Sequence, residues 1–276
     1  KAPFPYQEAR SHLFLAHPEW SCFDIDGRPV NRLSYAYPEV RKATYELLAE
    51  IVQLGATGVN NVYVRGVPLV LYEEPVRKRF QEKYGKDPCH LPENHFDVQS
   101  IRAEFVSEYM REQRLALDRA AGGHVSIMAT VPANNAICLF YGLDIATWAK
   151  EGLIDILCPY EFGINANYEP LNLDEHCAAI KGTPVKCLPF VNTWRDNDPI
   201  KVLQKALSFT RWPIDGFSVW DGILRSVGFD KALMALHSTN DIHAMIHELE
   251  NFKPLHHKIV MLDGMHHDKY NFGWNF

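Results

Sequence analysis

The sequence predicts an α/β fold with parallel strands, and two observations carry this prediction. Short apolar runs of strand character recur about 30 residues apart, which is the length of one βαβ unit. Each run is followed by polar or aromatic residues, as expected where strands of an α/β fold deliver side chains to a ligand site. The runs are Val125–Val131, Ile154–Phe162, Val185–Val191 and Gly216–Trp220.

Length and composition point to one large domain spanning residues 1–276. The chain has 276 residues, of which 47% are hydrophobic, enough to bury a sizeable core. A net charge of -6 without a basic run argues against nucleic acid, and no apolar run reaches the length of a membrane span. The six cysteines show no CxxC spacing, so neither a zinc site nor a disulfide framework is expected. The first residues lack the apolar core of a signal peptide, and the compartment stays open.

The chain is expected to begin with an irregular loop over residues 1–37, because prolines and scattered aromatic residues fill it. Asp24–Gly27 has the composition of a turn. Tyr37-Pro38-Glu39 then predicts a helix start with Pro in the first turn, and Gly55 predicts its end. The next strand is predicted at Gly58–Val64, with Arg65 just past its carboxyl end.

Helices are predicted between and after the strands. Asp97 is the expected N-cap of a long helix that continues to about Ala121. We expect a C-terminal extension over residues 240–276, with a last short strand at His257–Leu262. The other predicted helices are Pro75–Lys83, Leu143–Lys150, Leu173–Ile180, Pro199–Phe209, Phe229–Leu236 and Asp241–Leu249.

Several stretches resemble bacterial glycoside-hydrolase-like proteins of the family 10 glycosylhydrolase type, and the resemblance covers nearly the whole chain. The stretches are His17–Trp20, Ser34–Arg41, Gly58–Pro68, Leu71–Pro75, Phe80–Gly85 and Phe140–Asp144.

The resemblance implies a (β/α)8 TIM-type barrel. In that family the HPEW-like loop, here His17–Trp20, follows barrel strand three, so the chain would carry units four to eight, with about five parallel strands and helices outside. Relatives often end strand four with Asp, whereas Asn61, Val62 and Tyr63 stand here. A nucleophile on that strand is therefore not expected.

Cleavage of a glycosidic bond without a cofactor needs two carboxyl groups, one protonated and one ionised. Glu161 is the best candidate for the acid, since it ends a strand between two aromatic residues that could desolvate it. Asp221 and Glu73 are the other candidates. Each has a structural alternative: Glu161 as a helix cap or an arginine partner, Asp221 as a turn residue, and Glu73 as an acid at a helix start.

A second set of residues could bind a sugar. Arg65 would hold a substrate oxygen or pair with a nearby glutamate, and Asn192 would bond a hydroxyl or form a turn. Tyr72 follows in the loop after the strand. Aromatic rings suit the C–H faces of pyranose rings, although such residues also build cores. The candidate platforms are Trp20, Tyr160, Trp194 and Trp220.

Three functions remain open. The first is a glycoside hydrolase, and the second a non-catalytic carbohydrate-binding remnant of a barrel. The third is a metal-dependent hydrolase using the histidines at 256, 257, 266 and 267, whose spacing matches no helical HxxxH pattern. If only five strands are present, the open sheet edges would need cover from a homo-oligomer or from an N-terminal segment that precedes Lys1.

Overall fold

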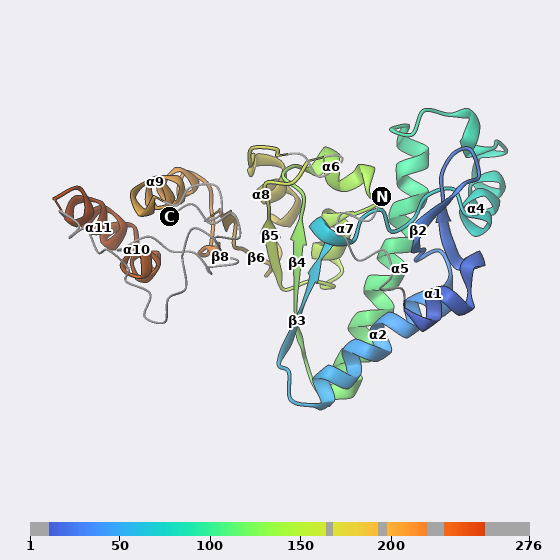
Figure 1. Cartoon of the computed structure of the whole chain (residues 1–276), viewed down its shortest axis with the longest axis horizontal. Coiled ribbons are helices and arrows are strands. Elements are labelled where there is room, and N and C mark those ends of the chain that lie inside the picture. Colours follow the sequence, from blue (N-terminus) through green and yellow to red (C-terminus); the bar gives the residue numbers. More distant parts are fainter. Residues whose placement is uncertain (1–10, 164–167, 193–197, 220–228, 252–276) are drawn as a thin grey trace, which may run out of the picture. The chain divides into compact units, whose positions relative to one another are not determined.

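The computed structural model describes residues 11–163, 168–192, 198–219 and 229–251 (Figure 1). The chain divides into two compact units. The first comprises the residues up to Phe190 together with Trp212–Asp215, and the second comprises Val191–Arg211 and the residues from Gly216 onward. Each unit is described by itself below.

The first unit contains a mixed α/β arrangement whose elements follow in chain order. Its helices and strands are α1 (His12–Ala16), η1 (Pro18–Trp20), β1 (Ser21–Phe23), β2 (Pro29–Leu33), α2 (Pro38–Gln53), β3 (Gly58–Val62), α3 (Tyr63–Gly66), α4 (Glu74–Tyr84), η2 (Pro88–His90), α5 (Phe96–Ala121), β4 (Ser126–Val131), α6 (Asn135–Phe140), α7 (Ile145–Lys150), β5 (Ile156–Pro159), α8 (Asp174–Ile180) and β6 (Lys186–Cys187).

The central sheet has the order β3-β4-β5-β6, with every neighbouring pair parallel. This confirms the predicted parallel, sequential pairing of the strands near Asn60, Ile127, Ile156 and Cys187. The predicted strand at Val185–Val191 is instead divided into β6 and β7 (Phe190–Val191). Pro189 separates them because proline has no N–H to donate to a ladder.

The strand predicted near Ser218 does not continue the central sheet in the described residues. β8 (Ser218–Val219) pairs with β7 in a separate two-stranded sheet. Among its described residues the second unit also has three helices, α9 (Pro199–Phe209), α10 (Phe229–Ala235) and α11 (Thr239–Asn251), in mutual contact. These three helices lie close to their predicted ranges, and the strand predicted at His257–Leu262 lies outside the described residues.

The two faces of the central sheet differ in burial. Ile127, Ala129 and Leu157 point to one face and are completely buried in a core shared with α5. On the opposite face Met128 and Ile156 are half-buried, whereas Thr130 and Cys158, nearer the carboxyl ends of the strands, are buried. Sequential parallel strands with right-handed crossovers place all the connecting helices on the same side of a sheet, which accounts for this asymmetry.

Helix α5 is the central element of the covered face. It spans 26 residues, contacts α2 and contributes Ile101, Phe105 and Met110 to the core (Figure 1). Its N-cap is His95, whose Nδ1 accepts a hydrogen bond from the Asp97 backbone N–H. The prediction of Asp97 as N-cap was therefore wrong by two residues. His95 can take this role because an imidazole nitrogen accepts the capping hydrogen bond as a carboxylate does.

The expectation of an irregular loop over residues 1–37 was wrong for residues 21–33, which form the antiparallel hairpin β1-β2. The predicted turn Asp24–Gly27 connects the two strands. Asp24 Oδ1 accepts the Asp26 and Arg28 backbone N–H groups, and Gly27 takes the left-handed conformation with φ 75°.

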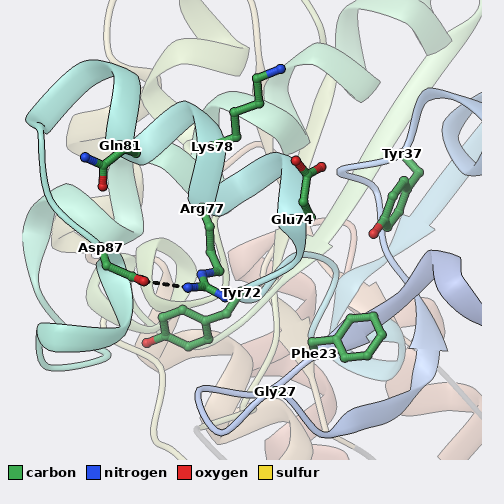
Figure 2. A pocket seen from close by; sticks show the side chains of 9 residues that line it. All are labelled: Phe23, Gly27, Tyr37, Tyr72, Glu74, Arg77, Lys78, Gln81 and Asp87. Carbon is green, nitrogen blue, oxygen red and sulfur yellow. Dashed lines mark hydrogen bonds and ion pairs between the residues drawn. The ribbon is translucent and has the colours of Figure 1, made fainter.

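The hairpin turn and helix α4 enclose a pocket of about 530 Å³, named here the hairpin pocket (Figure 2). Its lining residues are Phe23, Gly27, Tyr37, Tyr72, Glu74, Arg77, Lys78, Gln81 and Asp87.

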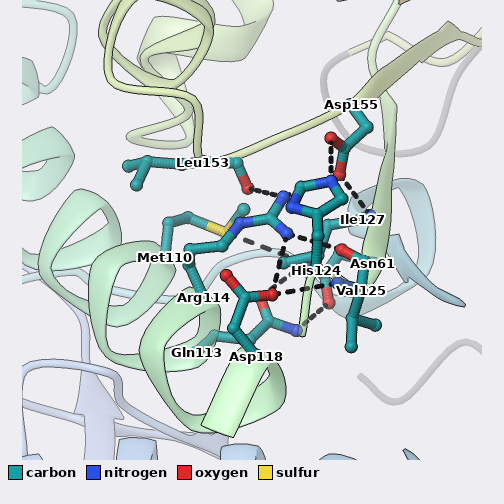
Figure 3. Close-up of polar contacts among 10 residues, drawn as sticks. All are labelled: Asn61, Met110, Gln113, Arg114, Asp118, His124, Val125, Ile127, Leu153 and Asp155. Atoms are coloured by element: carbon teal, nitrogen blue, oxygen red, sulfur yellow. Dashed lines mark hydrogen bonds and ion pairs between the residues drawn. The ribbon is translucent and has the colours of Figure 1, made fainter. Parts of the chain in front are cut away.

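A polar network joins α5 to the amino ends of β4 and β5 (Figure 3). The buried Arg114 guanidinium donates to the carbonyl oxygens of Val125 and Leu153, and its Nη2 lies 2.7 Å from Asp155 Oδ2. Asp155 also accepts the Ile127 backbone N–H at 2.7 Å and contacts His124. Burial raises the pKa of Asp155, but the Ile127 N–H and then Arg114 outweigh that effect and lower it.

We expect Asp155→Asn to lower the free energy of unfolding by about 1–3 kcal/mol at neutral pH. The amide oxygen can still accept the Arg114 and Ile127 hydrogen bonds, but it carries no negative charge, so the buried Arg114 loses its ionic partner. Urea denaturation followed by circular dichroism measures the difference.

The matched control is Glu151→Gln. Glu151 pairs with Arg111 at 2.6 Å on the exposed side of α5, where an ion pair contributes at most about 1 kcal/mol. The lowered pKa of Asp155 means that its contribution is complete above the ordinary Asp pKa of about 3.9 and is lost as pH falls through the folded-state value. An effect of Asp155→Asn no larger than that of Glu151→Gln would contradict this account.

Candidate functional site

Three loops follow the carboxyl ends of β3, β4 and β5, and parallel strands place these ends at the same edge of the sheet. β3 leads directly into α3, β4 leads to Pro132, and β5 leads to Tyr160 and Glu161. The Ala133 backbone N–H donates to the Phe162 carbonyl at 3.1 Å, which joins the loops after β4 and β5. This edge is the place where an α/β fold binds ligands.

Glu161 lies two residues past the end of β5, as the sequence predicted. It is only 5% exposed, so the carboxyl group that follows this strand is buried and not exposed. The chain turns tightly here, since the Phe162 N–H lies 2.6 Å from the Tyr160 carbonyl oxygen. The Tyr168 hydroxyl donates to Glu161 Oε1 at 3.2 Å. Tyr168 is 43% exposed, so one oxygen of this buried carboxylate is bonded to a group that solvent reaches.

Tyr160 is half-buried beside Glu161. Its ring packs on Phe190, with centroids 4.3 Å apart and planes inclined by 33°. The Tyr160 backbone N–H donates to the Val131 carbonyl at 2.8 Å, which extends the β4-β5 ladder to this residue. A ring held in this way is a rigid aromatic group at the carboxyl edge of the sheet.

Below that edge, on the face of the sheet opposite α5, the buried Thr130 Oγ1 donates to Asn60 Oδ1 at 3.0 Å. The neighbouring Asn61 faces the opposite way and forms a reciprocal amide pair with Gln113 of α5, at 2.8 and 3.0 Å. Residues 58–66 contain no carboxylate. Asn61 of β3, which stands where relatives often carry Asp, thus has a structural role: its amide holds the strand against α5.

Glu73 is completely buried and organises the loops around it. Its Oε1 accepts the Phe23 backbone N–H at 3.2 Å, and its Oε2 accepts the Leu71 N–H at 2.9 Å. Burial raises the pKa of Glu73, and these backbone N–H groups offset part of that rise. Burial and then the Glu73 carboxylate raise the pKa of the adjacent Cys22 thiol well above its usual range. The contacts give Glu73 a structural role; its catalytic role stays a prediction.

Tyr72 and Arg65 come from the same loop region but have different surroundings. Tyr72 is 5% exposed, lines the hairpin pocket, and has the Arg102 guanidinium 4.8 Å from its ring centre. Arg65 is exposed, and its carbonyl accepts a hydrogen bond from Arg32 at 3.4 Å. It lies within α3, because β3 ends at Val62 and not at the predicted Val64.

The remaining candidates are spread over the chain. Trp20 stacks on His17 with ring centroids 3.7 Å apart and is half-buried in η1. Asn192 is 5% exposed and belongs to the second compact unit. Trp194, Trp220 and Asp221 lie outside the described residues. The structure therefore brings Tyr160 next to Glu161, whereas the predicted convergence of Glu161, Asn192, Asp221 and Arg65 stays a prediction.

Some residues of this region were not predicted from the sequence. Tyr168 lies seven residues after Glu161 in a loop without periodicity, so no pattern indicated that it would reach the carboxylate. Phe23, Tyr37 and Gln81 of the hairpin pocket come from three separate elements. Only the composition of the Asp24–Gly27 turn gave a partial signal for this pocket.

No group of three His, Cys, Asp or Glu side chains suited to a metal ion occurs within the described ranges. The histidines at 256, 257, 266 and 267, considered above as metal ligands, lie outside those ranges. Among the helices that the structure describes, none combines the length and apolar character needed to cross a membrane.

A scan against protein-family models found no match, and a search of curated proteins found none.

We expect the stability that Glu73 contributes to depend on pH, with Glu73→Gln as the reference. A raised carboxyl pKa means that the folded state keeps a proton which the unfolded state loses above about pH 4.3. The free energy of unfolding of the wild-type chain relative to Glu73→Gln should thus fall as pH rises from about 4 toward 7. Urea denaturation at a series of pH values measures this.

The exposed Glu82→Gln on α4 is the control for removal of a carboxylate, and it should change the free energy of unfolding by less than about 0.5 kcal/mol. A wild-type advantage over Glu73→Gln that grows with rising pH would show that the backbone N–H groups, and not burial, dominate at Glu73.

Proposed function

We propose that this chain is a glycoside hydrolase that cleaves an oligo- or polysaccharide with paired carboxyl groups and without a cofactor. The single observation that carries the proposal is Glu161, a 5% exposed carboxyl group at the carboxyl end of a parallel strand, flanked by Tyr160 and bonded by Tyr168. A buried carboxyl group beside aromatic rings suits the acid that protonates a glycosidic oxygen.

We further propose that the central sheet is part of a (β/α)8 barrel. Four parallel strands in sequential order, with helices on one face only, support this, because a doubly wound sheet reverses its strand order and carries helices on both faces. The half-buried Met128 and Ile156 would then belong to the barrel interior. The resemblance to family 10 glycosylhydrolase-type proteins implies the same architecture.

In this mechanism Glu161 donates its proton to the oxygen of the leaving sugar as the glycosidic bond breaks. The Tyr168 hydroxyl donates a hydrogen bond to one of the carboxyl oxygens, which helps to orient the group. Asp221 is the proposed second carboxylate, acting as nucleophile or as base toward water. β3 and α3 do not supply this group, since residues 58–66 contain no carboxylate.

A second function, carbohydrate binding without turnover, is favoured by the lack of a carboxylate on β3 itself. Asn61 stands where relatives often carry Asp, and its amide is already paired with Gln113 of α5. A chain with aromatic platforms and only one working carboxyl group would bind a glycan without cleaving it. Turnover by the wild-type chain distinguishes the two functions.

We expect Glu161→Gln to lower hydrolysis by about 10²- to 10⁴-fold, the range typical of a lost general acid or base. The melting temperature should change little, because glutamine has nearly the shape of glutamate and its amide oxygen can also accept the Tyr168 hydroxyl. Release of reducing ends from starch, xylan, mixed-linkage β-glucan and galactomannan measures turnover.

The matched control is Glu169→Gln, a half-buried carboxylate from the same loop, which should keep wild-type turnover. Equal turnover by Glu161→Gln and the wild-type chain would remove Glu161 from the mechanism. Binding of a glycan by a wild-type chain that releases no reducing ends would favour the second function.

A further inference from the structure

The hairpin pocket has the shape and composition of a ligand site separate from the Glu161 loop. Its volume of about 530 Å³ falls within the range of roughly 300–1,000 Å³ usual for small-molecule pockets. Figure 2 shows Phe23 and Tyr37 on one side of the pocket and Arg77 and Gln81 of α4 on the other. Aromatic faces and hydrogen-bonding groups therefore line the same space.

The aromatic side is held rigidly by the buried Glu73. This carboxylate accepts the backbone N–H groups of Phe23 and Leu71, and the Tyr72 N–H donates to the Phe23 carbonyl at 3.0 Å. Arg102 lies against the Tyr72 ring. Phe23 and Tyr72 are thus fixed relative to each other before any ligand binds, which reduces the entropic cost of binding.

The charges in the pocket balance. Arg77 and Asp87 form an ion pair at 2.5 Å and neutralise each other. The remaining charged residues, Glu74 and Lys78, contribute one negative and one positive group. An ionic ligand such as a phosphate gains little from such a site, whereas a neutral ligand with many hydroxyl groups finds both donors and acceptors.

Tyr37 and Gln81 supply hydrogen-bonding groups that are not charged. Burial, followed by the Glu73 and Glu74 carboxylates, raises the pKa of Tyr37 to about 12, so its hydroxyl stays protonated at neutral pH. Gln81 is exposed and offers both a donor and an acceptor. The turn at Gly27 adds backbone without a side chain, which leaves room for a ring to approach.

We propose that the hairpin pocket is a subsite for one sugar unit of a neutral glycan, with a pyranose face on Phe23 and hydroxyl groups bonded to Tyr37 and Gln81. Glu73 is then a positioning residue that fixes the aromatic wall, and not a catalytic residue. The inference rests on the proposed carbohydrate specificity, but it does not require that the chain cleave the glycan.

The test is calorimetric titration of the full chain with neutral hexasaccharides of the malto-, cello-, xylo- and manno-series. Phe23→Ala should weaken binding at least tenfold, since an aromatic contact contributes roughly 0.5–1.5 kcal/mol beyond its buried area. Phe23→Tyr keeps the ring face and should bind within about threefold of the wild-type affinity. Gln81→Ala should weaken binding several-fold and is safe for folding because its side chain is exposed. The control is Lys86→Ala, an exposed position outside the pocket.

The outcomes separate this inference from the proposed hydrolase activity. Hexasaccharide binding that depends on Phe23 and Gln81, in a chain that releases no reducing ends, keeps the subsite and overturns the hydrolase. Hydrolysis that depends on Glu161 but is equal in the wild-type chain, Phe23→Ala and Gln81→Ala overturns the subsite alone. The subsite is also overturned if no hexasaccharide binds the wild-type chain. If Phe23→Ala fails to fold, as its melting curve would show, Gln81→Ala against Lys86→Ala decides.

Discussion

The Arg114–Asp155 interaction is the constraint on which the arrangement of the first unit depends. Arg114 belongs to the central helix α5, and its guanidinium reaches the carbonyl of Val125 before β4 and that of Leu153 before β5. Asp155 in turn accepts the Ile127 N–H of β4. One buried cation and one carboxylate thereby fix the starting points of two strands against a helix. A buried charge that lost its partner would remain uncompensated, so alternative registers of β4 and β5 are disfavoured.

The register set at the amino ends determines what reaches the carboxyl ends. Met128 pairs with Ile156 and Val131 with Pro159, so the next residues along β5, Tyr160 and Glu161, emerge beside the loop that begins at Pro132. A shift of one residue in the register of β5 would turn Leu157 from the core to the face of the sheet opposite α5. It would also move Glu161 away from its present position. The position of the candidate acid is therefore a consequence of the polar network at the opposite end of the same strands.

The sequence predicted the repeating elements well because burial on one face leaves a periodic pattern. The strands near Ile127 and Ile156 and the helix α9 at Pro199–Phe209 follow directly from it. It predicted the polar contacts poorly, because these join residues far apart in the chain. Glu73 bonds Phe23 across 50 positions, and Arg114 bonds Asp155 across 41. The β1-β2 hairpin was also missed, since its short strands lack an alternation of apolar and polar residues. Only the turn at Asp24–Gly27 could be predicted from composition.

The two ends of the central sheet use ionisable groups in opposite ways. At the amino ends Asp155 has a cation, a histidine and a backbone N–H as partners, and together they lower its pKa despite burial. Such a group is stable in one charge state and is a poor proton donor near neutral pH. At the carboxyl ends Glu161 accepts a hydrogen bond from the hydroxyl of the exposed Tyr168. The network at the amino ends thus stabilises the fold, and the carboxyl ends of the same strands form the edge at which α/β folds place their ligands.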